Sequence, residues 1–248
     1  MCYLCRVRAL RIAVTTCALL ALAPAAAAAT TVYAATSLRA VFPRIDGGMT
    51  YSFGGSNLLQ MQIQRGAPAD VFASASQAEP RALHRSGRCG RPATFATNVL
   101  VLIVPKGNPG RIRSASDLAR GPRRRIAVGA PGVPVGDYTR RLLTKMGLES
   151  VLTRNRVSNE PNVGGVTSKV ALGAAAAGFV YATDARSATD RVRAITLPAR
   201  AQPPIRYDFC IVLRRSGDRA GAQAFVNEVR SPRGRRLLHE AGFGVLAR

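Results

Sequence analysis

Small and hydroxyl-bearing residues recur where the predicted strands of this 248-residue chain give way to helices. Ser37 and Ser56 each follow a short apolar run, and Val135, beside Gly136, and Val163 stand where further helical patterns begin. The first turn of a helix carries backbone N–H groups without an intrahelical partner and a partial positive charge. If these junctions meet in one crevice, they form a cage of neutral donors for a multiply charged anion. Taken singly, each serine is more typical of simple N-capping.

Two further features could contact an anion. The glycine-rich segment Gly129–Gly136 precedes a helical pattern and could cradle an anion with its backbone, although an ordinary strand-to-helix turn has the same composition. Tyr181 ends an apolar strand, so its hydroxyl could donate to a ligand. A tyrosine in such a place is also typical of a half-buried core residue with its hydroxyl at the surface.

Motifs of common catalytic sites are absent. The chain has no G-x-S-x-G elbow, no phosphate-binding loop with its lysine, no dinucleotide fingerprint and no H-E-x-x-H pair. His84 and His239 are the two histidines, which excludes the usual zinc-ligand spacings. A binding protein without a cofactor is therefore favoured over an enzyme.

The elements that must position these residues alternate along the chain. Short apolar runs and helix-period segments follow one another, which is typical of α/β architecture with mostly parallel sheets. We expect strands at 31–35, 49–53, 70–74, 98–104, 126–128, 178–181, 192–197 and 205–213. We expect helices from Ser37 to the break at Pro43, from Ser56 to Gly66, and over 79–85, 137–146, 163–170, 222–229 and onward from Pro232.

Composition bounds the class of protein. With 47% hydrophobic and 20% charged residues, the chain can bury a real core, which excludes intrinsic disorder. Lys and Arg number 36 against 13 Asp and Glu, a net charge of +23 that attracts anions of any size. The charges are scattered and aromatic residues make up 6%, so a basic nucleic-acid-binding protein is kept only as an alternative.

Residues 1–29 have the pattern of an export signal. Three arginines precede an apolar stretch at 12–24, and an alanine run ending at Ala29 offers a cleavage site. The residues before Cys17 do not form a lipobox, so lipid anchoring at Cys17 is not favoured. Removal of this segment leaves Cys89 and Cys210, which could pair in an oxidising compartment or stay as two buried thiols.

Six segments carry a resemblance to a known family. They read AATSL at 34–38, FGGS at 53–56, GAPADVFAS at 66–74, NVLVLIVPKG at 98–107, AVGAPGVPVG at 127–136 and GFVYATDA at 178–185. In this order they resemble the periplasmic molybdate-binding proteins of ABC importers over nearly the whole chain after the signal. The segment at 66–74 is the most distinctive.

The resemblance implies a fold and a function. The fold is the two-lobed periplasmic binding protein type II fold, with residues 30–98 and 207–248 in lobe 1 and residues 99–206 in lobe 2. The lobes close on a tetrahedral oxyanion, molybdate or its near twin tungstate, held by neutral hydrogen bonds. The implied partner is the membrane permease of an ABC transporter, and the implied protein is an exported, periplasmic or extracytoplasmic monomer.

The resemblance also assigns the site position by position. The family's first-helix serine corresponds to Ser37 and its second-helix serine to Ser56, and both would bind the anion through their hydroxyls. A backbone N–H donor in the V-P-x-G turn falls on Val135, the valine that opens the next helix falls on Val163, and the tyrosine donor falls on Tyr181. Any contact with molybdenum would be made through the oxygens of the anion.

Three departures from the family pattern bear on the ligand. The chain between Ser37 and Ser56 is shorter, which shortens the first helix by about two turns. Gly164 stands where the family commonly has arginine, and Val135 replaces the usual alanine. A retuned site for sulfate or phosphate is therefore the second hypothesis.

Overall fold

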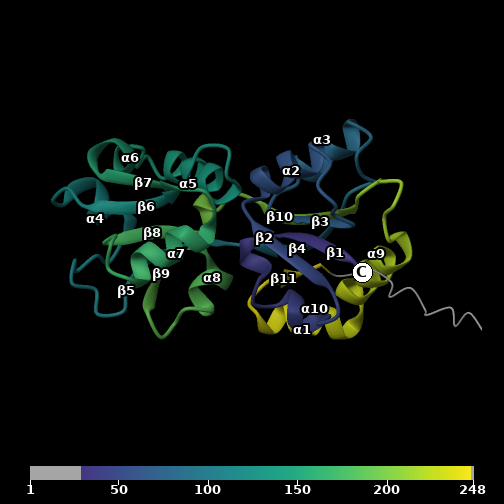
Figure 1. The fold of residues 1–248 in the computed structure, drawn as a ribbon. Coiled ribbons are helices and arrows are strands. Elements are labelled where there is room, and N and C mark those ends of the chain that lie inside the picture. Colours follow the sequence, from purple (N-terminus) through teal and green to yellow (C-terminus); the bar gives the residue numbers. More distant parts are fainter. Residues whose placement is uncertain (1–28, 247–248) are drawn as a thin grey trace, which may run out of the picture.

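The computed structural model describes residues 29–246, in which two β-sheets lie side by side, each flanked by helices (Figure 1). The expected export signal and Cys17 lie outside these residues, apart from Ala29. No helix within 29–246 combines the length and the apolar character needed to cross a membrane. The expected two-lobed α/β class is confirmed.

The six-stranded sheet holds both ends of the described chain. Its order is β11-β4-β10-β3-β1-β2, in which β1 is parallel to β2 and β3, and β10 is antiparallel to β3 and β4. Figure 1 shows two helices on one face, α2 (Ser56–Gln64) and α3 (Ala78–Arg85), and three on the other, α1 (Phe42–Ile45), α9 (Arg219–Arg230) and α10 (Pro232–Glu240). The strands are β1 (Thr31–Ala35), β2 (Thr50–Gly54), β3 (Val71–Ser74), β4 (Ala93–Asn98), β10 (Ile205–Ile211) and β11 (Gly244–Val245).

The five-stranded sheet is built from the middle of the chain. Its order is β7-β6-β8-β5-β9, with β6 parallel to β7 and β8, and β5 antiparallel to β8 and β9. The strands are β5 (Leu100–Pro105), β6 (Arg125–Gly129), β7 (Arg156–Glu160), β8 (Ala177–Tyr181) and β9 (Val192–Thr196). The helices are α4 (Ala115–Arg120), α5 (Pro134–Lys145), α6 (Ser150–Arg154), α7 (Val163–Ala171) and α8 (Ala182–Arg186).

Both sheets are mixed, so the expectation of mostly parallel sheets is wrong. Strands β5 and β10 run antiparallel to both of their neighbours. The sequence of β5, LVLIVP, is apolar on both faces because the strand lies inside its sheet and is buried on both sides, whereas β10, IRYDFCI, carries Arg206 and Asp208 on one face. An apolar run of this kind indicates burial but not direction, which is why the sequence pattern misjudged the orientation.

The chain passes between the sheets twice, between Asn98 and Leu100 and between Thr196 and Ile205. The boundary expected between 206 and 207 falls inside β10, where Ile205 already pairs with Asn98 of β4. We keep the division into lobes as a proposal, with lobe 1 formed by 30–98 and the chain from Ile205, and lobe 2 by the residues between.

The segment after β1 differs from the expected helix. Ser37 lies in a short 3-10 turn, Thr36–Leu38, and does not cap it with its side chain. Pro43 does not end a helix but stands in the first turn of α1, where the missing N–H of proline costs nothing. The sequence pattern had merged these two pieces into one helix.

An aromatic cluster forms part of the core of the six-stranded lobe. The rings of Phe42 and Phe225 meet edge to face at 5.2 Å, and those of Phe95 and Phe209 stack at 5.0 Å. Tyr207 of β10 lies among these rings, with Phe95 6.2 Å away. The cluster fixes the ring of a tyrosine whose hydroxyl contacts Ser37, a residue of the site described below.

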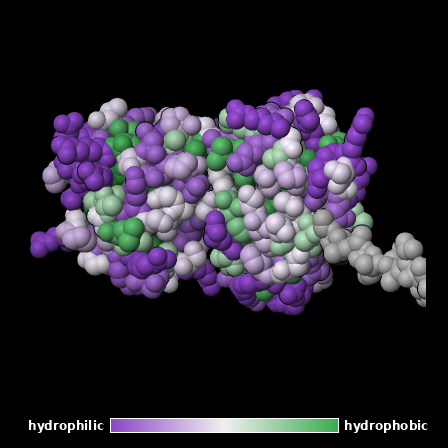
Figure 2. Space-filling model, in the orientation of Figure 1, coloured by the Kyte–Doolittle hydropathy of each residue, from purple (hydrophilic) through white to green (hydrophobic). Residues whose placement is uncertain are grey.

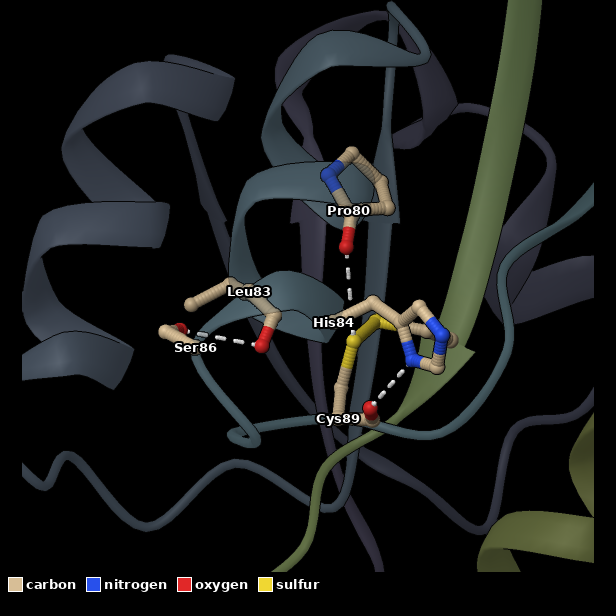
Figure 3. Close-up of a disulfide and its surroundings, with 6 residues drawn as sticks. Pro80, Leu83, His84, Ser86 and Cys89 are labelled. Carbon is tan, nitrogen blue, oxygen red and sulfur yellow. Dashed lines mark hydrogen bonds between the residues drawn. A yellow bond between two sulfur atoms is a disulfide. The ribbon is translucent and has the colours of Figure 1, made fainter.

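Cys89 and Cys210 form a disulfide, which decides between the two states that the sequence left open. The bond joins the loop after α3 to β10, with the two Cα atoms 6.0 Å apart (Figure 3). His84 lies beside it, with Nδ1 3.0 Å from the carbonyl oxygen of Cys89.

Candidate functional site

A small cavity lies between the two sheets. Its volume is about 20 Å³, where one water needs about 10–15 Å³, which excludes a bulky ligand. All five residues predicted from the sequence line it. The full lining is Ala35, Thr36, Ser37, Gly54, Gly55, Ser56, Ala75, Val133, Pro134, Val135, Asn162, Val163 and Tyr181.

The cavity lies at the carboxyl ends of strands from both sheets. Strands β1 and β2 lead into Ser37 and Ser56, β6 and β7 lead into Val135 and Val163, and β8 ends at Tyr181. Within each sheet, parallel strands bring their carboxyl ends to the same edge, and ligands of α/β sheets bind there. The fold therefore converges residues that are far apart in the sequence.

Three helices begin at the cavity. Helices α2 and α5 have no side-chain hydrogen bond at their N-caps, which are Gly55 and Val133. In α7, the side chain of Asn162 accepts from the backbone N–H of Gly165. The first-turn N–H groups of these helices give the cavity a positive partial charge without an ion. N-capping by Ser56, the alternative function of this serine, does not occur.

Ser56 is oriented by a backbone contact. Its side chain is buried, and its Oγ accepts a hydrogen bond of 3.1 Å from the N–H of Ala75. A hydroxyl that accepts from a backbone N–H keeps its own proton for another partner. Ser56 can therefore act as a donor to a ligand in the cavity.

Tyr181 presents a buried hydroxyl without a protein partner. The residue is 1% exposed, and its hydroxyl makes no hydrogen bond with any residue that the structure describes. Burial raises the pKa of this hydroxyl well above its usual range, so it stays a neutral donor. The alternative for Tyr181, a half-buried residue with its hydroxyl at the surface, is therefore wrong. A buried polar group without a partner is costly, which indicates a ligand at this point.

Sequence reasoning missed two polar residues of the lining. Thr36 places its Oγ1 in the buried region with no hydrogen-bond partner among residues 29–246. Asn162 both caps α7 and lines the cavity. Their positions beside Ser37 and Val163, and the preference of asparagine for N-caps, were the available signals.

The residues that line the cavity within the described chain are all uncharged. A dianion held by a buried ion pair would cost desolvation on both sides, whereas fixed hydroxyl and amide dipoles need little reorganisation. The arginines lie elsewhere, and Figure 2 shows hydrophilic residues spread over both halves of the visible face rather than gathered in one patch. Residues 29–246 contain no group of three or more His, Cys, Asp or Glu side chains placed to bind a metal ion.

Two glycines allow the lobes to approach across the cavity. A Cβ on Gly55, which caps α2, would collide with the carbonyl oxygen of Pro161 just before α7. A Cβ on Gly164 would come within 2.8 Å of Cγ2 of Thr36. The glycine at 164, where the resembling family commonly has arginine, thus lets α7 pack against the turn that carries Ser37.

The family of bacterial extracellular solute-binding proteins matches residues 26–244 of this sequence. The chain belongs to this family. Among its relatives, the molybdate-binding protein ModA of Mycobacterium tuberculosis is 38% identical over 222 residues, which cover 86% of this chain and 83% of that protein.

Solved structures of solute-binding proteins resemble the fold. The periplasmic molybdate-binding protein of Azotobacter vinelandii matches with a TM-score of 0.76 and 28% identity, covering 88% of this chain and 100% of that one. The sulfate-binding protein SubI of Mycobacterium tuberculosis matches with a TM-score of 0.73 and 18% identity, covering 87% of this chain and 86% of that one. The second likeness concerns the fold alone.

Proposed function

We propose that this solute-binding protein captures molybdate in the cavity between the two sheets. The observation that carries the proposal is the convergence of Ser37, Ser56, Val135, Val163 and Tyr181 on one small cavity with an uncharged lining. The hydroxyl of Tyr181, which has no partner among the described residues, supports an acceptor at this point. The molybdate-binding names of the relatives support the choice of anion.

In the proposed complex, the hydroxyls of Ser37, Ser56 and Tyr181 donate to the oxygens of molybdate, and the backbone N–H groups of Val135 and Val163 complete the cage. Each hydrogen bond to a charged acceptor contributes about 1.5–3 kcal/mol. Tungstate has nearly the same size and charge, so the cage binds it as well. Because no cation is needed in the lining, size and shape select the anion.

The proposal extends to the place of the protein in transport. An exported, periplasmic monomer with residues 1–29 removed would take up the anion in its open form and close on it. The closed form would deliver the anion to the membrane permease of an ABC transporter. The surplus of arginine in the sequence raises the local anion concentration and so assists capture.

A thermal-shift series tests the function. The protein without residues 1–29 is melted with molybdate, tungstate, sulfate or phosphate at matched ionic strength. Because a ligand of the native state raises the melting temperature by mass action, we expect a rise with molybdate and with tungstate. A rise with sulfate or phosphate alone would assign a different oxyanion to the same fold, and no rise with any of the four would contradict an oxyanion site.

Ser56→Ala tests the site. Removing this donor should raise the dissociation constant of molybdate about tenfold to a hundredfold, as measured by calorimetry. Ser86→Ala is the matched control, because Ser86 bonds the carbonyl of Leu83 at the end of α3, away from the cavity (Figure 3). Equal affinities in the wild type and Ser56→Ala would remove Ser56 from the site.

A further inference from the structure

Behind Ser37 lies a short chain of hydrogen bonds that does not reach the cavity itself. The hydroxyl of Tyr207 is 2.9 Å from Oγ of Ser37. On its other side, Nδ2 of Asn98 is 3.5 Å from the hydroxyl of Tyr207 and 3.0 Å from Oγ1 of Thr183. Tyr207, Asn98 and Thr183 are buried, and none of them lines the cavity.

The ring of Tyr207 has little freedom to move. The residue is 0% exposed and packs edge to face against Phe95, Tyr181 and Phe243, at centroid distances of 6.2, 5.8 and 5.3 Å. Burial raises the pKa of its hydroxyl well above the usual range, so the proton stays on the oxygen. The hydroxyl is therefore a fixed, protonated group next to Ser37.

Donors and acceptors in this chain have a defined direction. The N–H of Val99 donates to Oδ1 of Asn98 at 2.9 Å, which assigns the amide and turns its NH₂ group toward Tyr207. An NH₂ group cannot accept, so the proton of Tyr207 points to the remaining neighbour, Oγ of Ser37. Ser37 then accepts from Tyr207, and its own proton is free to point into the cavity.

We propose that Tyr207, oriented by Asn98, is a positioning residue that holds Ser37 as a hydrogen-bond donor to the oxyanion. This inference rests on the proposed function and adds a determinant of specificity. With one lone pair of Oγ taken by Tyr207, Ser37 directs its own proton at the ligand. Fully ionised tetrahedral dianions present an acceptor oxygen to this proton in every orientation, whereas the protonated oxygen of hydrogen phosphate would place its own proton against that of Ser37.

The chain of hydrogen bonds also reaches the first passage between the sheets. Asn98 is the last residue of β4, and the strand of the other sheet begins at Leu100. The side chain of Asn98 contacts Tyr207 in β10 of the six-stranded sheet. It also contacts Thr183 in α8, which flanks the five-stranded sheet. The geometry that directs Ser37 is thus complete when both lobes are in place.

A double-mutant cycle tests the proposal in the protein without residues 1–29. Molybdate and phosphate are titrated by calorimetry into the wild type, Tyr207→Phe, Ser37→Ala and the double variant. We expect Tyr207→Phe to weaken molybdate about three- to tenfold and to reduce the preference for molybdate over phosphate. In the Ser37→Ala background the same change should have no further effect, because Tyr207 acts through Ser37.

Controls separate this role from stability. Tyr51→Phe removes another tyrosine hydroxyl of the same lobe, one that donates to the carbonyls of Phe42 and Asp46, and should leave both affinities unchanged. If Tyr207→Phe does not fold, Asn98→Ala replaces it, with a smaller loss that also disappears in the Ser37→Ala background.

The outcomes distinguish the two hypotheses. The wild type could bind molybdate while the losses of affinity from Tyr207→Phe and Ser37→Ala add in the double variant. This result would overturn the positioning role and leave the proposed function intact. An unchanged preference over phosphate in Tyr207→Phe would do the same. A wild type that binds no oxyanion would overturn both.

Discussion

At the scale of single residues, the site is a set of polar groups whose partners are incomplete inside the protein. Tyr181 and Thr36 each bury a hydroxyl that has no hydrogen bond to a described residue, and both line the cavity. The cost of such groups is recovered when a ligand accepts from them. Stability without ligand and affinity for it therefore depend on the same atoms.

Asp184 is a buried carboxyl group with no ion-pair partner among residues 29–246. Its Oδ2 has no hydrogen-bond partner in residues 29–246, and burial raises its pKa to about 7, against the opposing effect of contacts with its own backbone and with Thr183. The folded state thus holds this proton up to about pH 7, whereas the unfolded chain releases it near pH 4. The free energy of unfolding must then fall as pH rises through this interval.

Asp184→Asn tests this linkage. Relative to the variant, the wild type should lose about 4 kcal/mol of unfolding free energy between pH 4 and pH 7, because each unit of pKa difference corresponds to about 1.4 kcal/mol. Denaturant titrations at several pH values measure it. The control is Asp190→Asn, whose carboxylate is 73% exposed and should leave the pH dependence unchanged. Parallel curves for the wild type and Asp184→Asn would contradict the raised pKa.

At the scale of elements, the sequence predicted the apolar strands well and the polar ones poorly. Strands β1, β3, β5 and β8 are short apolar runs, and each was expected within about two residues. Strands β4 and β7, which read ATFATN and RVSNE, were missed because their partly exposed polar residues hide the pattern. These segments are strands because β4 pairs with β10 and β7 pairs with β6, and such pairings are not visible in a local sequence pattern.

The same contrast holds for the site. Ser56 and Val163 could be predicted because each opens a helix after a strand, a local pattern. Tyr207 could not, because it looks like any apolar residue of the buried strand β10. Its relation to Ser37 joins residues 170 positions apart and exists only in the folded chain.

The disulfide joins Cys89, which precedes both passages between the sheets along the chain, to Cys210, which follows both of them. It closes a loop of 121 residues between the end of α3 and β10, so it restricts the unfolded chain strongly. Chain entropy for such a loop gives about 5 kcal/mol of stabilisation. The double variant Cys89→Ser and Cys210→Ser should therefore melt at a clearly lower temperature.

Ligand binding should be unaffected by this change, because neither cysteine lines the cavity. Melting curves and molybdate calorimetry on the double variant measure the two effects, and the wild type with and without reductant is the matched comparison. An unchanged melting temperature, together with two reactive thiols in the native wild type, would contradict the disulfide.

At the scale of the whole molecule, the cavity exists because two lobes meet with little space between them. The contact between Gly55 of one lobe and the carbonyl of Pro161 of the other leaves no room for a Cβ. A methyl group at this point should therefore oppose this arrangement of the lobes, whereas inside its own lobe it would meet only the movable end of a side chain, Oδ1 of Asn57, at 2.9 Å. Overpacking of this kind costs about 1–3 kcal/mol.

Gly55→Ala makes closure measurable. If the cost falls on the closed form, the dissociation constant of molybdate rises about fivefold to a hundredfold, while the melting temperature without ligand changes little. Small-angle scattering should show a smaller decrease in radius of gyration on addition of molybdate than in the wild type. Gly107→Ala is the control, because a Cβ there meets no atom within 4 Å. Wild-type affinity and wild-type compaction in Gly55→Ala would show that binding does not require the approach of Gly55 to Pro161.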